Sequence, residues 1–258
     1  MERIRDTKPG GISGAGLRTW GMLFLTAGIV DKCILQNRLL HLEIVTPQQL
    51  LEAMRGSDTV MLYATLALVM QALETCAVPI FAFLLAEGAQ HTAHFGNYFL
   101  RVAGVAVLSE IPYNLAVSGR LLDFSARNPA FGLVVCLAML YFYRRFPGKK
   151  QPNLLVRGLV TVAAVLWCSM LSIQYGGCLV VIFTVLWAFR SKPMLRSVAG
   201  ASAAMLCCLS SMFFMASPMG FLAVHFYNGE KGADNRIVNY LAYPVLLLII
   251  GAASVLLG

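Results

Sequence analysis

Residues 59–87 read TVMLYATLALVMQALETCAVPIFAFLLAE, and this stretch decides the fold. Only Glu74 and Glu87 carry a charge within it. An apolar run of roughly 18 or more residues is typical of a helix that crosses a membrane. This run is longer than one bilayer needs, and Pro79 lies inside it. We therefore expect a transmembrane helix that is kinked or strongly tilted.

Similar apolar runs recur along the whole chain. Of its residues 59% are hydrophobic and 12% are charged, whereas a soluble domain carries about 25% charged residues. No polar region is long enough to form a soluble domain, so residues 1–258 are interpreted as a single integral membrane domain. Further spans are expected at about 17–37, 97–118, 130–147, 153–172, 175–190, 195–215 and 237–257.

The number of spans depends on the C-terminal third of the chain. Residues 217–232, SPMGFLAVHFYNGEKG, hold an apolar run that is too short to cross a bilayer straight. They either continue the preceding span after a kink at Pro218 or form a short span of their own. Backbone polar groups cannot face lipid unpaired, and the alternating pattern of a barrel is absent from the sequence. The predicted fold class is therefore all-α, a polytopic transmembrane bundle of eight or nine helices.

The polar segments predict how this bundle is oriented. Residues 1–16 are basic and Gly-rich, and most other basic residues fall in loops on the same side, which favours a cytoplasmic N-terminus. Residues 41–58 are polar with spaced apolar positions, so we expect an interfacial helix or a loop there. The net charge of +8 follows from this distribution, and no nucleic-acid partner is expected because no basic stripe with interleaved aromatic residues exists.

Two ionisable side chains mark the end of the long apolar run. Glu87 and His91 are four residues apart, so they share a face if the helix continues. The carboxylate then orients the imidazole and raises its basicity, as a general base requires. The alternative is a helix end capped by polar residues in the headgroup region.

A second acid lies deeper in the bilayer. Glu110 follows Asn97 by about 20 Å of helix, Pro112 frees a backbone carbonyl nearby, and Asn114 shares the face of Glu110. These groups predict either a polar pocket facing the bundle interior or a structural hydrogen bond between helices. Asp31 and Glu74 are expected to pair with Lys32 or with another helix.

Several motifs resemble those of the TraX family of bacterial membrane proteins. The resemblance is carried by VPIFAFLLAEGAQHT (78–92) and YFLRVAGVAVLSEIPYNLA (98–116), with their E-G-x-x-H-T, Y-x-x-R and S-E-I-P elements. Asn128, Tyr175–Gly176, YNGEKG (227–232) and Tyr243–Pro244 also fit the family pattern. The blocks together are fairly specific, whereas each alone is weak.

The resemblance implies an activity as well as a fold. The named member of the family is implicated in N-terminal acetylation of conjugative pilin subunits. The resemblance therefore implies that this chain is a multi-pass acyltransferase of the bacterial inner membrane. Such an enzyme moves an acetyl group from acetyl-CoA to an amine or hydroxyl of a peptide, lipid or glycan. The expected partners are the lipid bilayer, CoA and a membrane-associated acceptor; acetyl-CoA is a co-substrate, and neither a tightly bound cofactor nor a metal is expected.

On this reading, side chains fall into three groups. The candidate catalytic residues are His91 as general base, Glu87 as its orienting group, and Glu110. Candidate substrate-binding residues are Arg101, Asn114, Tyr98, Asn128, Tyr175, Tyr227 and Asn228. The basic residues of the inner loop, expected to attract the phosphates of CoA, are Arg144, Arg145, Lys149 and Lys150.

The sequence also departs from the family pattern. Gly28 and Ile29 stand where the family usually has Asp-His, and Leu246 stands where it has a second histidine after Tyr-Pro. Gln174 replaces the Asp of the family's Asp-Tyr-Gly. Two alternatives to an active enzyme follow: a catalytically degenerate protein that binds or scaffolds a partner, and a small transporter suggested by acids at bilayer depth.

Overall fold

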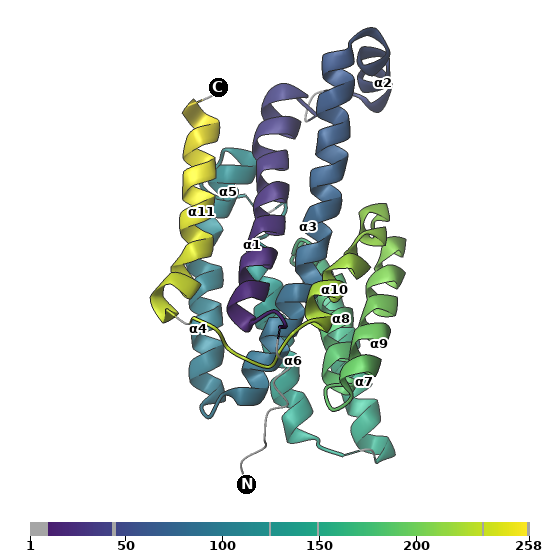
Figure 1. Ribbon diagram of the computed structural model, residues 1–258, viewed down its shortest axis with the longest axis vertical. Helices are drawn as coiled ribbons and strands as arrows, with labels where there is room; N and C mark the ends of the chain where they lie inside the picture. The colour runs from purple at the N-terminus through teal and green to yellow at the C-terminus, as the bar shows by residue number, and fades with distance from the viewer. Residues whose placement is uncertain (1–9, 43–44, 124, 149, 234, 257–258) are drawn as a thin grey trace.

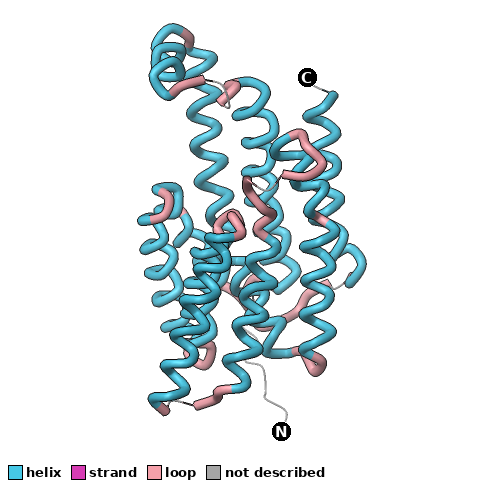
Figure 2. Tube along the Cα trace, turned by 180° about the vertical axis from the view of Figure 1, so that it is seen from behind, coloured by secondary structure: helices cyan, strands magenta, loops and turns pink. Residues whose placement is uncertain are grey.

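Helices make up nearly all of the ordered secondary structure. The computed structural model describes residues 10–42, 45–123, 125–148, 150–233 and 235–256, and within these ranges it contains helices and no β-strand. Most helices run along the long axis of the molecule (Figure 1), and loops form short connections between them (Figure 2). Two isolated bridges, between Ile12 and Tyr227 and between Arg127 and Ile173, join distant segments.

The elements follow the predicted apolar runs closely. The α-helices are α1 (Gly14–Val30), α2 (Pro47–Gly56), α3 (Asp58–His91), α4 (Phe95–Leu108), α5 (Glu110–Ser118), α6 (Ala130–Arg145), α7 (Gln151–Met170), α8 (Gly176–Ala188), α9 (Pro193–Leu206), α10 (Gly220–His225) and α11 (Arg236–Leu256). A π-helix, η1 (Asp31–Leu39), extends α1, and the 3₁₀-turns η2 (Cys207–Leu209), η3 (Met212–Met215) and η4 (Ser217–Met219) connect α9 to α10.

The longest helix, α3, continues through Pro79 without a break. Its 34 residues span about 51 Å, which exceeds the roughly 30 Å hydrocarbon core of a bilayer. Proline cannot donate to the carbonyl four residues before it, here that of Thr75. The hydroxyl of Ser217 on η4 donates to this carbonyl at 3.0 Å, and the Thr75 hydroxyl donates to the carbonyl of Phe213. The turns after α9 therefore complete the backbone bonding of α3.

The main hydrophobic core lies where α3 meets α6 and α8. Its largest fully buried side chains include Phe83, Ile80, Leu137 and Phe183. A smaller core joins α1, α5 and α11 around Leu247. The outer faces of the bundle expose many large apolar side chains, which is the arrangement of a protein solvated by lipid.

The number of membrane spans is supported only in part. Three helical stretches are long and apolar enough to cross a bilayer: 58–91, 95–118 and 151–170. Shorter apolar helices occupy 176–188, 193–209, 212–225 and 237–253, so the described helices do not confirm a count of eight or nine spans. Residues 195–215 are not one helix as predicted, because α9 ends at Leu206 and irregular turns then pack against α3.

The polar segment after the first span contains a helix. Thr46 caps α2 with a reciprocal bond pair: the backbone N–H of Gln49 donates to the Thr46 side chain, while the Gln49 side chain accepts from Thr46. Leu50 and Met54 of α2 pack against a small buried cluster that includes Ala64 and Ala67 of α3. Residues 43–44 and 1–9 lie outside the described residues, and the interfacial position of α2 stays a prediction.

Candidate functional site

A cavity of about 540 Å³ lies between α1, α3, α4, α6, α8 and α11. We call one end the mouth; it is lined by Arg18, His91, Thr92, Tyr98, Arg101, Lys231, Asn239 and Tyr240. We call the other the deep end; it is lined by Glu74, Gln174, Tyr175, Tyr243 and Pro129. Apolar side chains, among them Met22, Leu25, Val102 and Val105, line the walls between the two ends. His91 and Arg101 are exposed while Glu74 is buried, so solvent reaches the cavity from the mouth.

The mouth is strongly cationic. Arg18, Arg101 and Lys231 come from α1, α4 and the segment before α11, and all three line the cavity. Nη1 of Arg18 donates to Oδ1 of Asn239 at 2.5 Å, which ties α1 to α11 at this end. Glu74 is the only acid among the described lining residues, and it lies at the deep end. The mouth therefore favours an anionic group.

Tyr98 is fixed against α3 beside the mouth. Its hydroxyl donates to the carbonyl of Leu85 at 3.4 Å. Gly88 makes this approach possible, since a Cβ at position 88 would lie 2.6 Å from the Tyr98 hydroxyl. The Gly of the E-G-x-x-H-T motif thus has a packing role.

The structure brings His91 to the cavity but does not place Glu87 there. Nδ1 of His91 lies 2.9 Å from the Glu87 backbone carbonyl and 3.6 Å from its carboxylate, so the bond at ordinary length is to the backbone. The imidazole side chain is 50% exposed. Glu87 does not line the cavity, and its charge interacts with Arg196 of α9. The catalytic roles assigned to this pair stay predictions.

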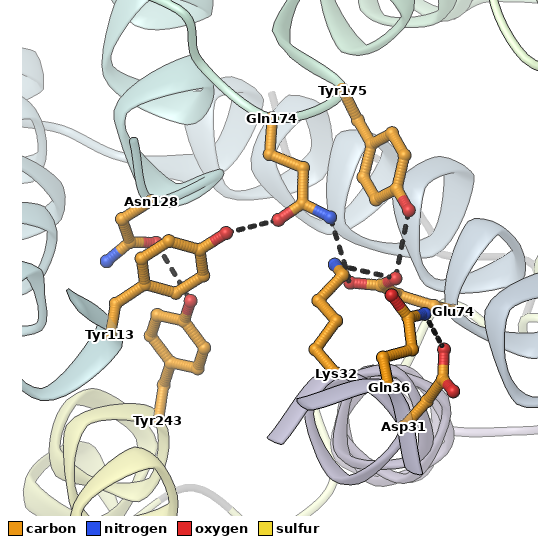
Figure 3. A network of polar contacts seen from close by, with 9 residues as sticks. All are labelled: Asp31, Lys32, Gln36, Glu74, Tyr113, Asn128, Gln174, Tyr175 and Tyr243. Carbon is orange, nitrogen blue, oxygen red and sulfur yellow. Dashed lines mark hydrogen bonds and ion pairs between the residues drawn. The ribbon is translucent and has the colours of Figure 1, made fainter. Parts of the chain in front are cut away.

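The deep end is built around the carboxylate of Glu74 (Figure 3). Nζ of Lys32 donates to both of its oxygens, at 2.8 and 3.0 Å. The Tyr175 hydroxyl donates to Oε2 at 2.9 Å, and Nε2 of Gln174 donates to Oε1 at 3.4 Å. For Glu74 the sequence leaves a choice between Lys32 and another helix as partner, and the structure shows the Lys32 ion pair together with bonds from Gln174 and Tyr175. A carboxylate with 2% side-chain exposure requires such partners, because an unpaired buried charge is costly.

Gly28 of α1 makes room for this carboxylate. A Cβ at position 28 would lie 2.3 Å from Cδ of Glu74, so no other residue fits there without moving Glu74. One helical turn later, Lys32 lies in the first turn of η1, and its ammonium points at Glu74. The neighbouring Asp31 accepts a bond from Nε2 of Gln36 at 2.6 Å, and its other oxygen has no partner in the described structure.

The hydrogen-bond network continues from Glu74 through Gln174 to α5, and a separate set of bonds beside it joins α11 to Asn128 (Figure 3). The Tyr113 hydroxyl donates to Oε1 of Gln174. The Tyr243 hydroxyl donates to Oδ1 of Asn128 at 2.8 Å, and Nδ2 of Asn128 donates to Ser109 at 2.7 Å. Asn128 is fully buried and also accepts the backbone N–H of Ala130, so it joins three elements instead of facing the cavity.

Glu110 and Asn114 lie outside the cavity. Glu110 is half-buried at the start of α5, with one oxygen 3.4 Å from the backbone N–H of Asn128. Asn114 is buried, and its side-chain oxygen has no partner within the described residues. Of the two readings of this cluster, the observed contacts favour structural bonding between α5 and the segment before α6.

Tyr227 and Asn228 belong to a loop that holds the start of α1. The backbone N–H of Asn228 donates to the Ile12 carbonyl, and the N–H of Ile12 donates to the Phe226 carbonyl. The carbonyls of Glu230 and Lys231 accept the N–H groups of Gly14 and Ala15. These acceptors satisfy donors that a helix N-terminus leaves open. Neither predicted substrate-binding residue lines the cavity, but their loop places Lys231 at the mouth.

The basic residues at the end of α6 and in the loop after it do not line the cavity. Nη2 of Arg144 donates to the carbonyl of Ala89 at 2.5 Å, and its guanidinium lies 4.3 Å from the centre of the Phe95 ring. Arg145 and Lys150 are exposed, and Lys149 lies outside the described residues. The predicted attraction of CoA to this loop stays untested.

Sequence reasoning missed part of the lining. Arg18, Lys231 and Asn239 lie far apart in the chain, and nothing in their local sequence marks them as neighbours. Glu74 carried a signal, as a charge inside an apolar run, but it was interpreted as structural. Tyr175, Tyr98 and Arg101 were predicted as binding residues, and all three line the cavity.

Comparison with known proteins identifies the family. The family described as TraX protein matches residues 50–254, which cover more than half of the chain. No curated protein and no solved structure matches the chain significantly. The apolar helices and this match together indicate a membrane protein. The chain belongs to the TraX family.

Proposed function

We propose that this protein is a membrane-bound acyltransferase, which moves an acetyl group from acetyl-CoA to an amine or hydroxyl of a peptide, lipid or glycan. The observation that carries the proposal is a single cavity with a cationic mouth and a buried polar deep end. A donor with a phosphate-bearing end and a reactive thioester at its other end matches both features.

In this proposal the mouth of the cavity binds the donor, and the deep end carries out the transfer. Arg18, Arg101 and Lys231 supply positive charge for the phosphates of CoA, since charge-assisted bonds to phosphate are among the strongest in proteins. The apolar walls exclude water from the path of the donor. The hydrogen-bond donors and acceptors of the deep end then face the thioester and the acceptor group.

The test is transfer of label from radiolabelled acetyl-CoA. Vesicles from cells that express the full chain are compared with vesicles from cells that do not, and label is measured in the lipid, peptide and glycan fractions. We expect label in one fraction only when the chain is present. The double variant Arg18→Gln/Arg101→Gln should raise KM for acetyl-CoA by at least about 100-fold, because each charged bond contributes roughly 1.5–3 kcal/mol.

The double variant Arg38→Gln/Arg55→Gln is the matched control for these substitutions. Both arginines are exposed, neither lines the cavity, and their replacement also lowers the net charge by two. It should leave KM unchanged. Equal labelling with and without the chain would contradict the proposed activity.

A second candidate function is binding without catalysis. It is favoured by the Glu74 carboxylate, whose oxygens already accept bonds from Lys32, Tyr175 and Gln174, as in a purely structural ion pair. A protein of this kind would still bind an anionic ligand at the mouth. Thermal stabilisation by acetyl-CoA without any label transfer would support this candidate over the enzyme.

A further inference from the structure

The deep end of the cavity contains a tyrosine hydroxyl that donates its proton to a buried carboxylate. Tyr175 lines the cavity and donates to Oε2 of Glu74 at 2.9 Å. A phenolic oxygen can donate and accept at the same time, so it can still accept an N–H or O–H from a molecule in the cavity. Glu74 accepts four bonds from Lys32, Tyr175 and Gln174, which is about the capacity of a carboxylate. Glu74 also lines the cavity, but because its acceptor positions are occupied, a proton from a molecule there reaches its charge through the Tyr175 hydroxyl.

We propose that Tyr175, backed by Glu74, takes the proton of the acceptor during acyl transfer. This inference rests on the proposed function above and assigns its reacting centre. Tyr175 is the catalytic residue because it faces the cavity, and Lys32 is a positioning residue because it holds the carboxylate of Glu74 on both oxygens.

The step balances without any further reactant. The amine nitrogen or hydroxyl oxygen of the acceptor attacks the thioester carbonyl carbon and forms the new bond. Its proton passes to the oxygen of Tyr175, while the phenolic proton of Tyr175 passes to Oε2 of Glu74. The carbon–sulfur bond then breaks, and the leaving thiolate takes the proton back through the same pair.

The pair of Tyr175 and Glu74 lies far from His91 along the cavity. Glu74 and His91 are 17 positions apart on one continuous helix, which is about 25 Å along the axis. His91 lies beside the cations of the mouth, where the phosphates of the donor are expected. When the phosphates of the donor are bound at the mouth, its thioester end extends into the cavity, away from His91 and toward Tyr175.

The backbone fixes the tyrosine in this position. Tyr175 has φ of +58°, a left-handed conformation that is uncommon for a residue with a side chain. The backbone N–H of Leu179 donates to the Tyr175 carbonyl, and Gly176 starts α8 against Cys168, where a Cβ would lie 2.8 Å from the cysteine Cβ. This turn directs the ring of Tyr175 toward Glu74 (Figure 3).

The experiment compares a tyrosine that lines the cavity with a buried tyrosine outside it, both in the full chain. Tyr175→Phe removes one hydroxyl, and we expect kcat for acetyl transfer to fall by about 100-fold or more with KM for acetyl-CoA little changed. Tyr143→Phe is the matched control, because its hydroxyl is bonded to Thr161 at 2.5 Å and lies outside the cavity. His91→Gln should raise KM and leave most of kcat.

A second variant and a binding assay distinguish loss of catalysis from loss of folding. Glu74→Gln combined with Lys32→Met removes both charges of the pair, so no unpaired ammonium stays buried, and it should lose kcat as Tyr175→Phe does. Stabilisation by acetyl-CoA shows that each variant keeps its cavity. Full kcat in Tyr175→Phe, or loss of kcat only in His91→Gln, overturns this inference while the proposed function stands. Absence of transfer by the parent chain overturns both.

Discussion

At the scale of single residues, Gly28 shows how a small side chain sets the position of a large charged one. Replacement by Ala puts a methyl group 2.3 Å from Cδ of Glu74, so the carboxylate must move away from Lys32 and Tyr175. Overpacking of this kind costs about 1–3 kcal/mol. We expect Gly28→Ala to lower the midpoint of thermal unfolding in detergent and to reduce acetyl transfer.

Gly104 provides the matched control for Gly28. It also lies within an α-helix, but no atom lies within 4 Å of the position its Cβ would take. Gly104→Ala should be neutral or stabilise by up to about 1 kcal/mol, because glycine is a poor helix former. Equal unfolding midpoints for the two variants would show that a methyl group fits at position 28 without displacing Glu74.

Ser217 is a second residue whose effect can be predicted. It donates to the Thr75 carbonyl that Pro79 leaves without its helical partner. Ser217→Ala leaves this buried acceptor unpaired, which costs about 1–3 kcal/mol. Chemical unfolding in detergent should show the loss. Ser202→Ala should change stability by less than about 0.5 kcal/mol, since the exposed Ser202 hydroxyl is bonded only to Val198 within its own helix.

At the scale of elements, the loop before α11 couples the start of α1 to the mouth of the cavity. Oδ1 of Asn228 accepts the backbone N–H of Glu230 at 2.9 Å, which stabilises the turn whose carbonyls cap α1. Asn228→Ala removes that bond and lets Lys231 move. We expect KM for acetyl-CoA to rise several-fold with kcat retained, measured by label transfer.

The control for this loop is an amide outside it. Asn97 is exposed in the first turn of α4, so Asn97→Ala should leave KM unchanged. If Asn228→Ala lowers kcat and leaves KM intact, the loop acts on the deep end and not on the mouth.

At the scale of the whole molecule, the length of α3 determines which parts lie on opposite sides of the bilayer. Gly56 and Gly96 lie just beyond its two ends, both are exposed, and neither has an atom near its Cβ position. In a Cys208→Ser background, Gly56→Cys and Gly96→Cys should react with a membrane-impermeant maleimide from opposite sides. The other six cysteines are buried.

This labelling also tests the predicted orientation. The mouth lies at the same end as the start of α1, and positive-inside counting predicts that this end is cytoplasmic. Gly96→Cys should therefore react only from the cytoplasmic side, where acetyl-CoA is available. Reaction of both cysteines from one side would contradict a transmembrane α3.

Some of this architecture follows from sequence alone because it depends on local composition. Long apolar runs bury their backbone bonds only as helices in lipid, so α3, α7 and the α4–α5 stretch were predicted close to their observed bounds. The motifs around Glu87 and Glu110 were enough to place the chain in the TraX family. Residues 195–215 were predicted wrongly as one helix, because apolar turns that pack against α3 look like a span in composition.

The tertiary structure alone decided which polar groups meet. Glu74 and Gln174 are 100 residues apart, and Arg18 and Asn239 are 221 apart, yet each pair is hydrogen-bonded. Composition and periodicity report which face of a helix is apolar, but they do not report which helix lies against it. The sequence by itself determined a helical membrane protein with acids at bilayer depth, whereas packing of α1, α3, α8 and α11 determined that the buried carboxylate facing the cavity belongs to Glu74.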